Sequence, residues 1–434
     1  MYHIRKRIGV VSVCLLLVFL LAACGSGSTS APAQDNPKES GEVKLNMWAH
    51  QGQEKEVAFY KTRIQKFNEA HKGKINVNLQ IIPSGAGHAY EDKINAAVTS
   101  GGLPDILDMD GPFVANYAST RILASLDEYI DETDKQDFAP SIMQQGTYEG
   151  KLYALGAMES SLVLFYNKKL LQEAGITPPD SLDKAWTWQQ FADHAKQLSK
   201  EGRYGVTLNM NLGVGEWMTF LGSVFVWSNG GELLSPDKKK AEGYVNAPAS
   251  VEALQFIHKL FADKSANISD TPTDFEEGRA AMSIQGPWII QGFDKYKDLD
   301  WGMTYLPYSK QKVSASGSWA FGISAQTKHP REAAEVVKWM TNKESTVEIS
   351  KLTGMPPARE SAFKELPQYN EMPLKVVKDQ VLNTAHARPA TPAYPVLSAK
   401  FAEAYQAAAM GQNVQEALNK AAQETDRELQ RFNR

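Results

Sequence analysis

Residues 43–49, VKLNMWA, and residues 75–81, INVNLQI, indicate the fold class of this chain. In the second stretch apolar and polar residues alternate, which is typical of a half-buried strand. Between the two stretches, apolar residues recur every three or four positions from Val57 to Phe67, which predicts one face of a helix. Strands separated by helices argue for an α/β fold with crossover connections. The sequence therefore predicts an α/β fold that starts near Glu42.

The same alternation continues along the chain. A helical pattern, EDKINAAV (91–98), is followed by a break and by an apolar-acidic stretch, DILDMD (105–110). Thr187 and Gln190 fit a capping box at the start of a helix, WQQFADHAKQL. Pro330 opens another helix, and the C-terminal third of the chain is predicted to be mostly helical.

The N-terminus carries a pattern of its own. Three cations at residues 5–7 precede a mostly apolar run, 8–21, which is shorter than the roughly 20 residues that a membrane-spanning helix needs. A basic head, a short apolar core and small residues predict a secretory signal over residues 1–23. The sequence LAAC, which ends at Cys24, resembles the lipobox of bacterial lipoproteins. This resemblance implies that Cys24 is lipidated and holds the mature chain on the membrane.

Composition narrows the functional classes. Residues 25–41, GSGSTSAPAQDNPKESG, are small and polar and predict, together with Cys24, a flexible tether over 24–41. The chain carries 46 Lys and Arg against 50 Asp and Glu, a net charge of −4. Because it also lacks a long basic run, nucleic acid is not an expected partner. Its two cysteines are Cys14, inside the signal, and Cys24, so no disulfide is expected within the mature chain.

Known catalytic signatures are missing from the sequence. It contains no Gly-x-Ser-x-Gly, no two His residues four apart, and no Cys-x-x-Cys or phosphate-loop motif. We therefore expect that this protein has no enzymatic activity, no metal site and no cofactor. One pair of acids leaves two readings open. Asp108 and Asp110 share a face of a strand and could be the two carboxylates of a glycosidase, or they could form a strand-end turn that binds nothing.

Tryptophan is the residue type that stands out, with nine in the chain. Four of them, Trp48, Trp217, Trp288 and Trp319, are predicted to lie where a strand ends or a loop begins. Indole rings offer flat apolar faces, and sugar rings offer C–H patches on their faces and hydroxyls at their edges. A cleft with Trp for the faces and with Asp, Glu or Arg for the hydroxyls would suit a sugar. For each Trp the alternative is packing in the core.

Longer segments carry a resemblance to a known family. They are LVLFYNKKLLQEAGITPP (162–179), FEEGRAAMSIQGPWII (275–290), GGLPDILDMDG (101–111), HPREAAEVVKWMTNKES (329–345) and GQNVQEALNKAAQE (411–424). In this order they resemble the extracellular solute-binding proteins that serve carbohydrate ABC transporters, a bacterial, maltose-binding-protein-like family. The resemblance covers essentially all of residues 42–434. It implies an α/β, two-lobed periplasmic-binding-protein fold, with crossing hinge strands and a ligand cleft between the lobes.

The resemblance also implies how the chain divides and what it does. The N-terminal lobe would comprise residues 42–153 and 312–356, and the C-terminal lobe residues 154–311 and 357–434. The implied function is that of a monomeric, lipid-anchored protein on the extracellular face of the cell membrane. It would capture a sugar, an oligosaccharide in the first place, and deliver it to the permease subunits of an ABC importer. The alternatives are a glycerol phosphate or another polyol as ligand, and a surface glycosidase.

Site residues can be transferred from the family only where segments match. Trp288 matches a tryptophan that stacks on sugar in the family, and Pro287 before it is expected to end a strand. Met109 departs from the family pattern, so maltose itself is not implied. The expected ligand-binding residues are Trp48, His50, Asp108, Met109, Asp110, Glu159, Glu216, Trp217, Trp288, Trp319 and Arg359.

Overall fold

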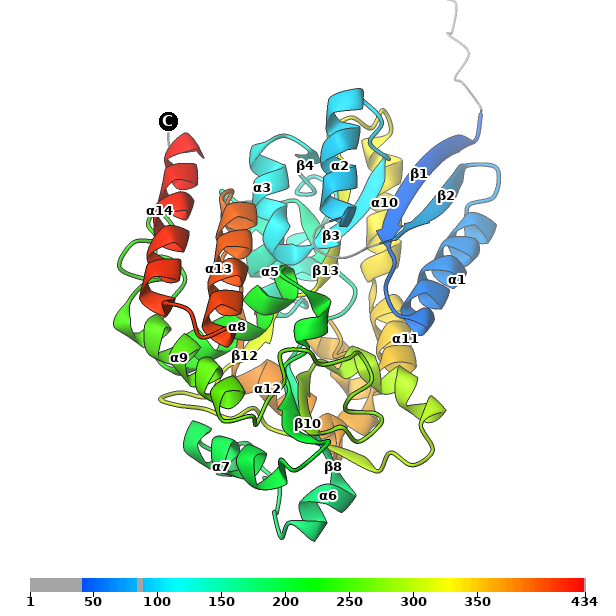
Figure 1. Cartoon of the computed structure of the whole chain (residues 1–434). Coiled ribbons are helices and arrows are strands. Elements are labelled where there is room, and N and C mark those ends of the chain that lie inside the picture. The colour runs from blue at the N-terminus through cyan, green and yellow to red at the C-terminus, as the bar shows by residue number, and fades with distance from the viewer. Residues whose placement is uncertain (1–40, 84–88, 433–434) are drawn as a thin grey trace, which may run out of the picture. The chain divides into compact units, whose positions relative to one another are not determined.

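The computed structural model describes residues 41–83 and 89–432 (Figure 1). The predicted signal peptide, Cys24 and the tether up to residue 40 lie outside the described residues. Residues Glu42–Arg434 form one compact unit. Within the described ranges, no helix is both long enough and apolar enough to cross a membrane.

The first sheet has six strands among the described residues. They are β1 (Val43–His50), β2 (Ile75–Ile82), β3 (Ile106–Asp110), β4 (Leu123–Ala124), β7 (Ala154–Gly156) and β13 (Trp319–Ser324). The order is β2-β1-β3-β13-β4, and β7 also pairs with β13. β1 runs parallel to β2 and β3, whereas β13 is antiparallel to its neighbours. The predicted strand–helix–strand unit is confirmed, because α1 (Glu54–Ala70) connects the parallel strands β1 and β2 (Figure 1).

The second sheet has four strands in the described part of the chain. They are β8 (Val163–Asn167), β9 (Tyr204–Thr207), β10 (Ala280–Gln285) and β11 (Trp301–Thr304), in the order β11-β8-β10-β9. β10 ends directly before Gly286 and Pro287, as expected from a proline that cannot donate a hydrogen bond to a sheet. A 3₁₀ segment, η4 (Pro287–Lys295), follows it.

Three described stretches of chain lead from one sheet toward the other. The first follows β7, the second runs from β11 through β12 (Ser314–Ser316) to β13, and the third follows α11 (Lys343–Thr353). Met158 forms a bridge with Pro357, so the first and third stretches lie side by side. β12 pairs with β14 (Ala385–Ala387). Because β7 pairs within the first sheet, that sheet extends three residues past the predicted lobe boundary at 153.

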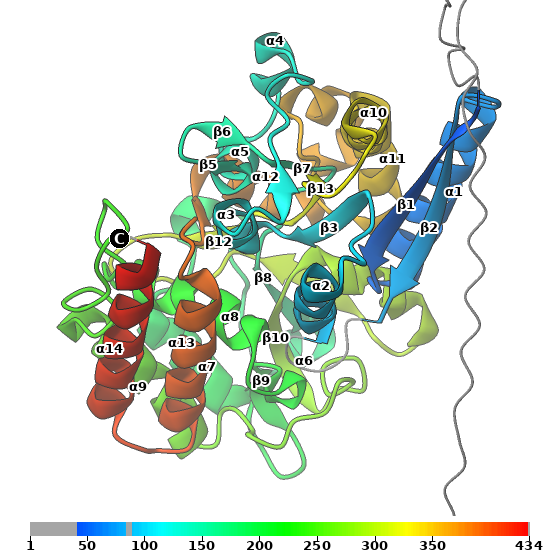
Figure 2. The ribbon, with the colours of Figure 1, turned by 90° about the horizontal axis from the view of Figure 1, so that it is seen from above.

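Helices dominate the C-terminal part, as the sequence predicts. The last two helices, at residues 394–409 and 414–432 and coloured orange and red, lie side by side in both views (Figures 1 and 2). The capping box of Thr187 and Gln190 is confirmed at the start of α7. A short hairpin consists of β5 (Thr147–Tyr148) and β6 (Lys151–Leu152). The other α-helices are α2 (Ala89–Ser100), α3 (Val114–Ser119), α4 (Glu132–Lys135), α5 (Pro140–Gly146), α6 (Lys168–Glu173), α7 (Trp188–Leu198), α8 (Glu216–Ser228), α9 (Pro248–Ala262), α10 (Pro330–Thr341), α12 (Leu374–Asn383), α13 (Tyr394–Ala409) and α14 (Val414–Phe432).

The apolar core follows from these elements. Leu45, Met47 and Ala49 point to one face of β1 and are buried in a cluster with residues of α1, α10 and α11. A larger cluster joins residues of both sheets with α8, α9 and α13, and Trp227 of α8 is among its fully buried side chains. Packing of this kind fixes α1 and α8, and the first turns of both helices contribute to the site described below.

Candidate ligand-binding site

A cavity of about 310 Å³ lies between elements of the first sheet and elements of the second. The first sheet contributes the ends of β1 and β3 and the start of β13, and the second contributes η4 and the start of α8. Sites at the carboxyl ends of strands are common in α/β proteins, and small-molecule sites start at about 300 Å³. The lining residues are His50, Gln51, Gly52, Gln53, Glu56, Asp110, Met158, Ser160, Glu216, Trp217, Phe220, Trp288, Gln291, Gly317, Ser318, Trp319, Thr353, Met355 and Arg388.

One wall of the cavity is aromatic. The rings of Trp217 and Trp288 meet edge to face at 6.3 Å, and Phe220 lies 6.3 Å from Trp288. The indole N–H of Trp217 donates to the Leu208 carbonyl at 3.0 Å, which fixes that ring. The Trp288 ring folds back over Gly286, where a Cβ atom would overlap the indole, so a larger residue there would displace the ring. The wall therefore offers apolar ring surface to a ligand, and its geometry is set by neighbouring backbone.

His50 and Trp319 stack on each other beside this wall, with ring centroids 3.5 Å apart and planes 11° from parallel. His50 Nδ1 lies 2.6 Å from Oδ2 of Asp108, and His50 Nε2 lies 3.4 Å from Glu56. Burial lowers the pKa of His50, but Asp108 and Glu56 outweigh burial, and the pKa is raised above its ordinary value. The carboxylates of Asp108 and Glu56 thus hold the His50 ring of the stacked pair in place.

A cluster of three charged residues closes another side of the cavity. Arg388 donates to both carboxylate oxygens of Asp110, at 2.7 and 2.8 Å, and also to Glu216. Tyr394 and Ser398 donate their hydroxyls to Glu216. Burial raises the pKa of Glu216 above its ordinary value, and Arg388 opposes that shift. Two carboxylates share one guanidinium here, so the cluster carries net negative charge when both acids are ionised.

The structure brings together six of the residues that the sequence predicted for the site. All six line the cavity: His50, Asp110, Glu216, Trp217, Trp288 and Trp319. Three of them end or start a strand of the first sheet, and two open α8. Their convergence supports the predicted link between strand ends, helix starts and the site.

The other five predicted residues do not line the cavity. Asp108 is fully buried beneath it, where His50 and Tyr90 donate to its carboxylate. Met109 points into the core on the opposite side of β3. Glu159 is fully buried in the stretch after β7. The two remaining residues are Trp48 and Arg359.

Trp48 and Arg359 contact other parts of the first sheet and its helices. Trp48 lies on β1 with the ammonium of Lys93 4.7 Å from its ring centroid. Arg359 donates to both carboxylate oxygens of Asp134, at 2.7 and 3.0 Å, and to the Thr341 carbonyl. These contacts satisfy the Arg359 guanidinium away from the cavity.

Among the lining residues that the sequence did not predict, Arg388 is the most important for the site. It follows β14 in a stretch without a motif, and its partners Glu216 and Asp110 are 172 and 278 residues away. Glu56 and Gln291 were also missed. Glu56 could have been found, because it lies in the first turn of the helix that follows His50, and an acid in that turn faces the same strand end.

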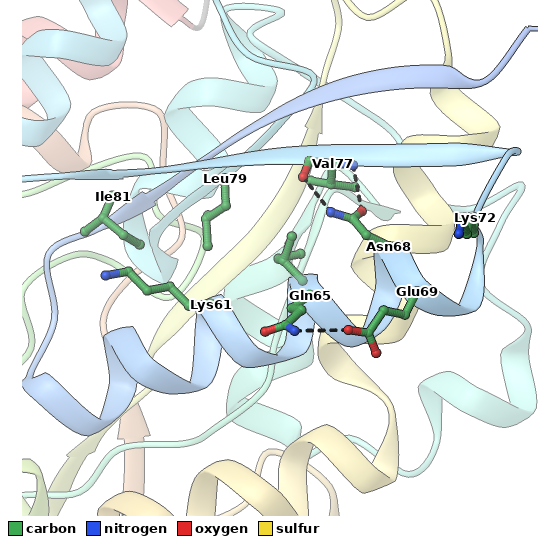
Figure 3. A pocket seen from close by; sticks show the side chains of 9 residues that line it. Lys61, Gln65, Asn68, Glu69, Lys72, Val77, Leu79 and Ile81 are labelled. Carbon is green, nitrogen blue, oxygen red and sulfur yellow. Dashed lines mark hydrogen bonds between the residues drawn. The ribbon is translucent and has the colours of Figure 1, made fainter.

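A second groove lies between α1 and β2 (Figure 3). Its volume is about 520 Å³, and Leu79, Ile81 and Lys61 are among its lining residues. Asn68 crosses the groove and pairs with Val77 twice, donating to its carbonyl at 3.0 Å and accepting from its N–H at 2.8 Å. The groove has no aromatic lining residue, and Asn68 satisfies the N–H and the carbonyl of Val77 on β2. We therefore assign it to the structure of the sheet edge. Over residues 41–83 and 89–432, no group of three or more His, Cys, Asp or Glu residues is placed to hold a metal ion.

Comparisons with known proteins agree with this geometry. The arabinooligosaccharide-binding protein of Bacillus subtilis is 25% identical over 379 residues, covering 82% of each chain. The maltooligosaccharide ABC transporter solute-binding lipoprotein of Streptococcus pneumoniae is 24% identical over 396 residues, covering 87% of this chain and 86% of that one. The crystal structure of the cyclic alpha-maltosyl-1,6-maltose binding protein of Arthrobacter globiformis matches with a TM-score of 0.76 and 25% identity, covering 90% of this chain and all of that one.

All three relatives are named as binding proteins, and the structural likeness confirms the predicted α/β, two-lobed fold. Residues 62–375, more than half of the chain, match the family model described as bacterial extracellular solute-binding protein. The resemblance that the sequence segments predicted is therefore confirmed, and the chain belongs to the bacterial extracellular solute-binding protein family.

Proposed function

We propose that this protein captures a sugar, an oligosaccharide in the first place, outside the cell and delivers it to an ABC permease. The observation that carries the proposal is the cavity wall of Trp217, Trp288 and Phe220, which faces a lining rich in carboxylates and amides. Aromatic faces suit the C–H patches of sugar rings, and Asp, Glu and Gln oxygens suit their hydroxyls. The names of the relatives, two of which bind arabino- or maltooligosaccharides, support the same ligand class.

A glycerol phosphate fits this lining less well. Among the lining residues in the described ranges, Arg388 is the one Arg or Lys side chain, and two carboxylates already occupy its guanidinium. A phosphate would need unoccupied donors of that kind. The charge of the cavity therefore favours a neutral polyhydroxyl ligand over an anionic one.

Binding without catalysis is part of the proposal. A glycosidase would need two carboxylates beside the scissile bond. Asp110 lines the cavity, but Asp108 has no exposed surface, and its oxygens accept bonds from His50 and Tyr90. The pair that the sequence left open thus supplies one carboxylate to the cavity and one to the structure beneath it, and Glu216, another acid of the lining, already shares the Arg388 guanidinium with Asp110.

Three further parts of the proposal rest on the sequence. Cys24 would carry the lipid that holds the protein, as a monomer, on the outer face of the cell membrane. The chain would cross from one lobe to the other near residues 153, 311 and 356. Replacing Cys24 with Ala should abolish labelling by a radioactive or clickable fatty acid, and unchanged labelling would contradict the anchor.

The experiment that tests the function is a thermal-shift screen of the mature protein against neutral mono- and oligosaccharides. A ligand that binds only the folded state raises its melting temperature, so at least one saccharide should do so in proportion to its concentration. Calorimetry should then give saturable binding, and chromatography after prolonged incubation should recover the saccharide intact. A panel without any stabilising saccharide, or release of shortened products, would contradict the proposal.

A further inference from the structure

The cluster of Asp110, Glu216 and Arg388 joins parts of the molecule that are far apart in the sequence. Asp110 is the last residue of β3 in the first sheet. Glu216 is the first residue of α8, and Arg388 directly follows β14. All three line the cavity, so the bonds among them connect its two sides.

Within the cluster, Arg388 and Asp110 form an ion pair with two hydrogen bonds, and Glu216 binds to the same guanidinium. The guanidinium of Arg388 meets Asp110 with two parallel N–H···O bonds of 2.7 and 2.8 Å, the arrangement that gives an Arg–carboxylate pair its directionality. The same guanidinium lies 4.6 Å from the ring centroid of Phe220, which belongs to the aromatic wall. Arg388 therefore fixes a carboxylate on one side and rests on an aromatic ring on the other.

Burial makes each member dependent on the others. The Arg388 side chain is 3% exposed, and the side chains of Asp110 and Glu216 are 12% and 19% exposed. Removing one partner of a buried ion pair leaves an uncompensated charge, which disturbs a site more than the loss of the contact itself. Without Arg388, two carboxylates would face each other across the cavity and would have to separate or take up a proton.

Arg388 has little capacity left to bond a ligand itself. Three of its five N–H groups donate to carboxylates, and its Nε–H, although unpartnered, is buried and not exposed to the cavity. Asp110 and Glu216, by contrast, line the cavity with carboxylates that keep acceptor capacity, on both oxygens of Asp110 and on Oε2 of Glu216. Direct contact with a ligand hydroxyl therefore falls to the carboxylates, and Arg388 acts through them.

We propose that Arg388 is a positioning residue of the ligand site. It holds Asp110 and Glu216 at a fixed separation across the cavity, so that ligand affinity depends on the cluster as a unit. This inference rests on the proposed sugar-binding function, and it assigns the polar half of that site to a residue that neither the motifs nor the family resemblance pointed to.

A double-mutant cycle tests the inference. The variants are Arg388→Met, Asp110→Asn and the double variant, with calorimetry against maltotriose and arabinotriose. We expect each single variant to lose at least tenfold in affinity for the sugar that binds, and the double variant to lose about as much as the weaker-binding single variant. Arg388→Lys, which keeps the charge but not the parallel bonds, should lie between wild type and Arg388→Met. Losses that multiply, or wild-type affinity of Arg388→Met, would overturn the proposal.

Two controls separate a positioning role from a structural one. Arg63→Met removes another fully buried Arg, which pairs with Glu344 and Glu348 away from the cavity. It should lower the melting temperature without changing affinity. If Arg388→Met does not fold, Arg388→Lys takes its place in the cycle.

Crystal structures of ligand-free wild type and Arg388→Met, or Arg388→Lys, decide the inference independently of any sugar. The separation of the Asp110 and Glu216 carboxylates should change in the variant, either because they move apart or because they close onto a shared proton, and unchanged positions would overturn the proposal. Failure of both sugars to bind wild type would count against the proposed function for these ligands, and the crystal comparison would still support or overturn the role of Arg388.

Discussion

Asp110 and Glu159 are both buried carboxylates next to strands of the first sheet, yet they belong to two different regions. Asp110 ends β3 and lines the cavity, whereas Glu159 lies three residues after β7, in the stretch that leads to β8. Asp110 pairs with a guanidinium. Glu159 has no exposed surface, and its carboxylate accepts from Ser160 N at 2.7 Å, from Gly317 N and from the Ser141 hydroxyl.

The bonds of Glu159 tie together the three stretches that connect the sheets. Its carboxylate accepts from Gly317 in the second stretch, and its own N–H donates to the Pro356 carbonyl in the third at 2.8 Å. Burial raises the pKa of Glu159, and the three donors oppose that shift. The hydrogen-bonding partner, more than the residue type, therefore distinguishes an acid of the ligand site from a structural acid. Two backbone N–H groups and a hydroxyl hold Glu159 in place for the fold, whereas Asp110 pairs with a cation and keeps acceptor capacity for a ligand.

The largest expected effect is on stability at Glu159. Glu159→Gln keeps the volume but replaces one acceptor oxygen with an NH₂ group that faces N–H and O–H donors. We expect the free energy of unfolding at pH 7 to fall by about 3 kcal/mol, since buried donors lose a charged acceptor. Urea unfolding measures this, with the exposed acid Glu232 as control, where Glu232→Gln should change stability by about 0.5 kcal/mol or less. Equal losses of unfolding free energy in both variants would contradict the structural role of Glu159.

The next effect is on affinity at the aromatic wall. Trp288→Ala removes a flat contact for the sugar, and aromatic anchors of this kind cost about 2 kcal/mol of binding, or about thirtyfold in affinity. Its ring is partly exposed in the cavity, so the melting temperature should fall less than in a core variant. Trp301→Ala is the matched control, because that ring is also partly buried but packs on Phe165 and Phe293, outside the cavity lining.

Calorimetry and thermal unfolding of both Trp variants separate the two roles. Trp301→Ala should lower stability by less than the roughly 3–5 kcal/mol that a fully buried aromatic residue costs, and it should leave affinity nearly unchanged in the folded fraction. If Trp288→Ala behaved in the same way, the aromatic wall would be core and not site.

Local patterns predicted the elements and those site residues that local structure positions. The strand–helix–strand unit followed from periodicity, and Trp288 followed from a proline that ends β10. His50, Asp110 and Trp319 lie at strand ends, where α/β folds place ligands. These residues were predictable because their position depends on the element that carries them.

Contacts between distant segments explain what the sequence could not predict. Asp108 and Asp110 are two residues apart and therefore point to the same face of β3. Asp108 lies further from the end of the strand, where His50 and Tyr90 cover it. Glu159 meets Gly317 and Pro356 only after the connecting stretches come together. Arg388 belongs to the site because it binds Glu216 and Asp110, which are 172 and 278 residues away in the sequence. No local sequence pattern predicts such a pairing.

A pH effect is expected at His50, which ends β1 and lines the cavity. Burial lowers its pKa, but Asp108, Glu56 and Asp110 outweigh burial and raise it. A raised pKa means that the stabilisation by the charged ring is fully present below the unfolded-state pKa of about 6.5 and is lost as the pH rises through the folded-state pKa. The difference in unfolding free energy between wild type and His50→Gln should therefore shrink from pH 6 to pH 9. A difference that grew with pH would contradict the arrangement of His50 between two carboxylates.

The smallest effect is expected at Trp48, two residues before His50 on the same strand. Its ring lies outside the cavity lining, and one of its contacts is the Lys93 ammonium at 4.7 Å, an interaction worth about 0.5–1 kcal/mol at an exposed site. Trp48→Phe keeps an aromatic ring on β1, so the change in stability should stay within that range. Affinity for the bound sugar should stay within about twofold of wild type, because no contact of the cavity wall is removed. Calorimetry beside Trp288→Ala makes the contrast direct. A tenfold loss at Trp48 would extend the ligand site along β1, and the boundary between site and scaffold would then lie beyond the cavity that the structure describes.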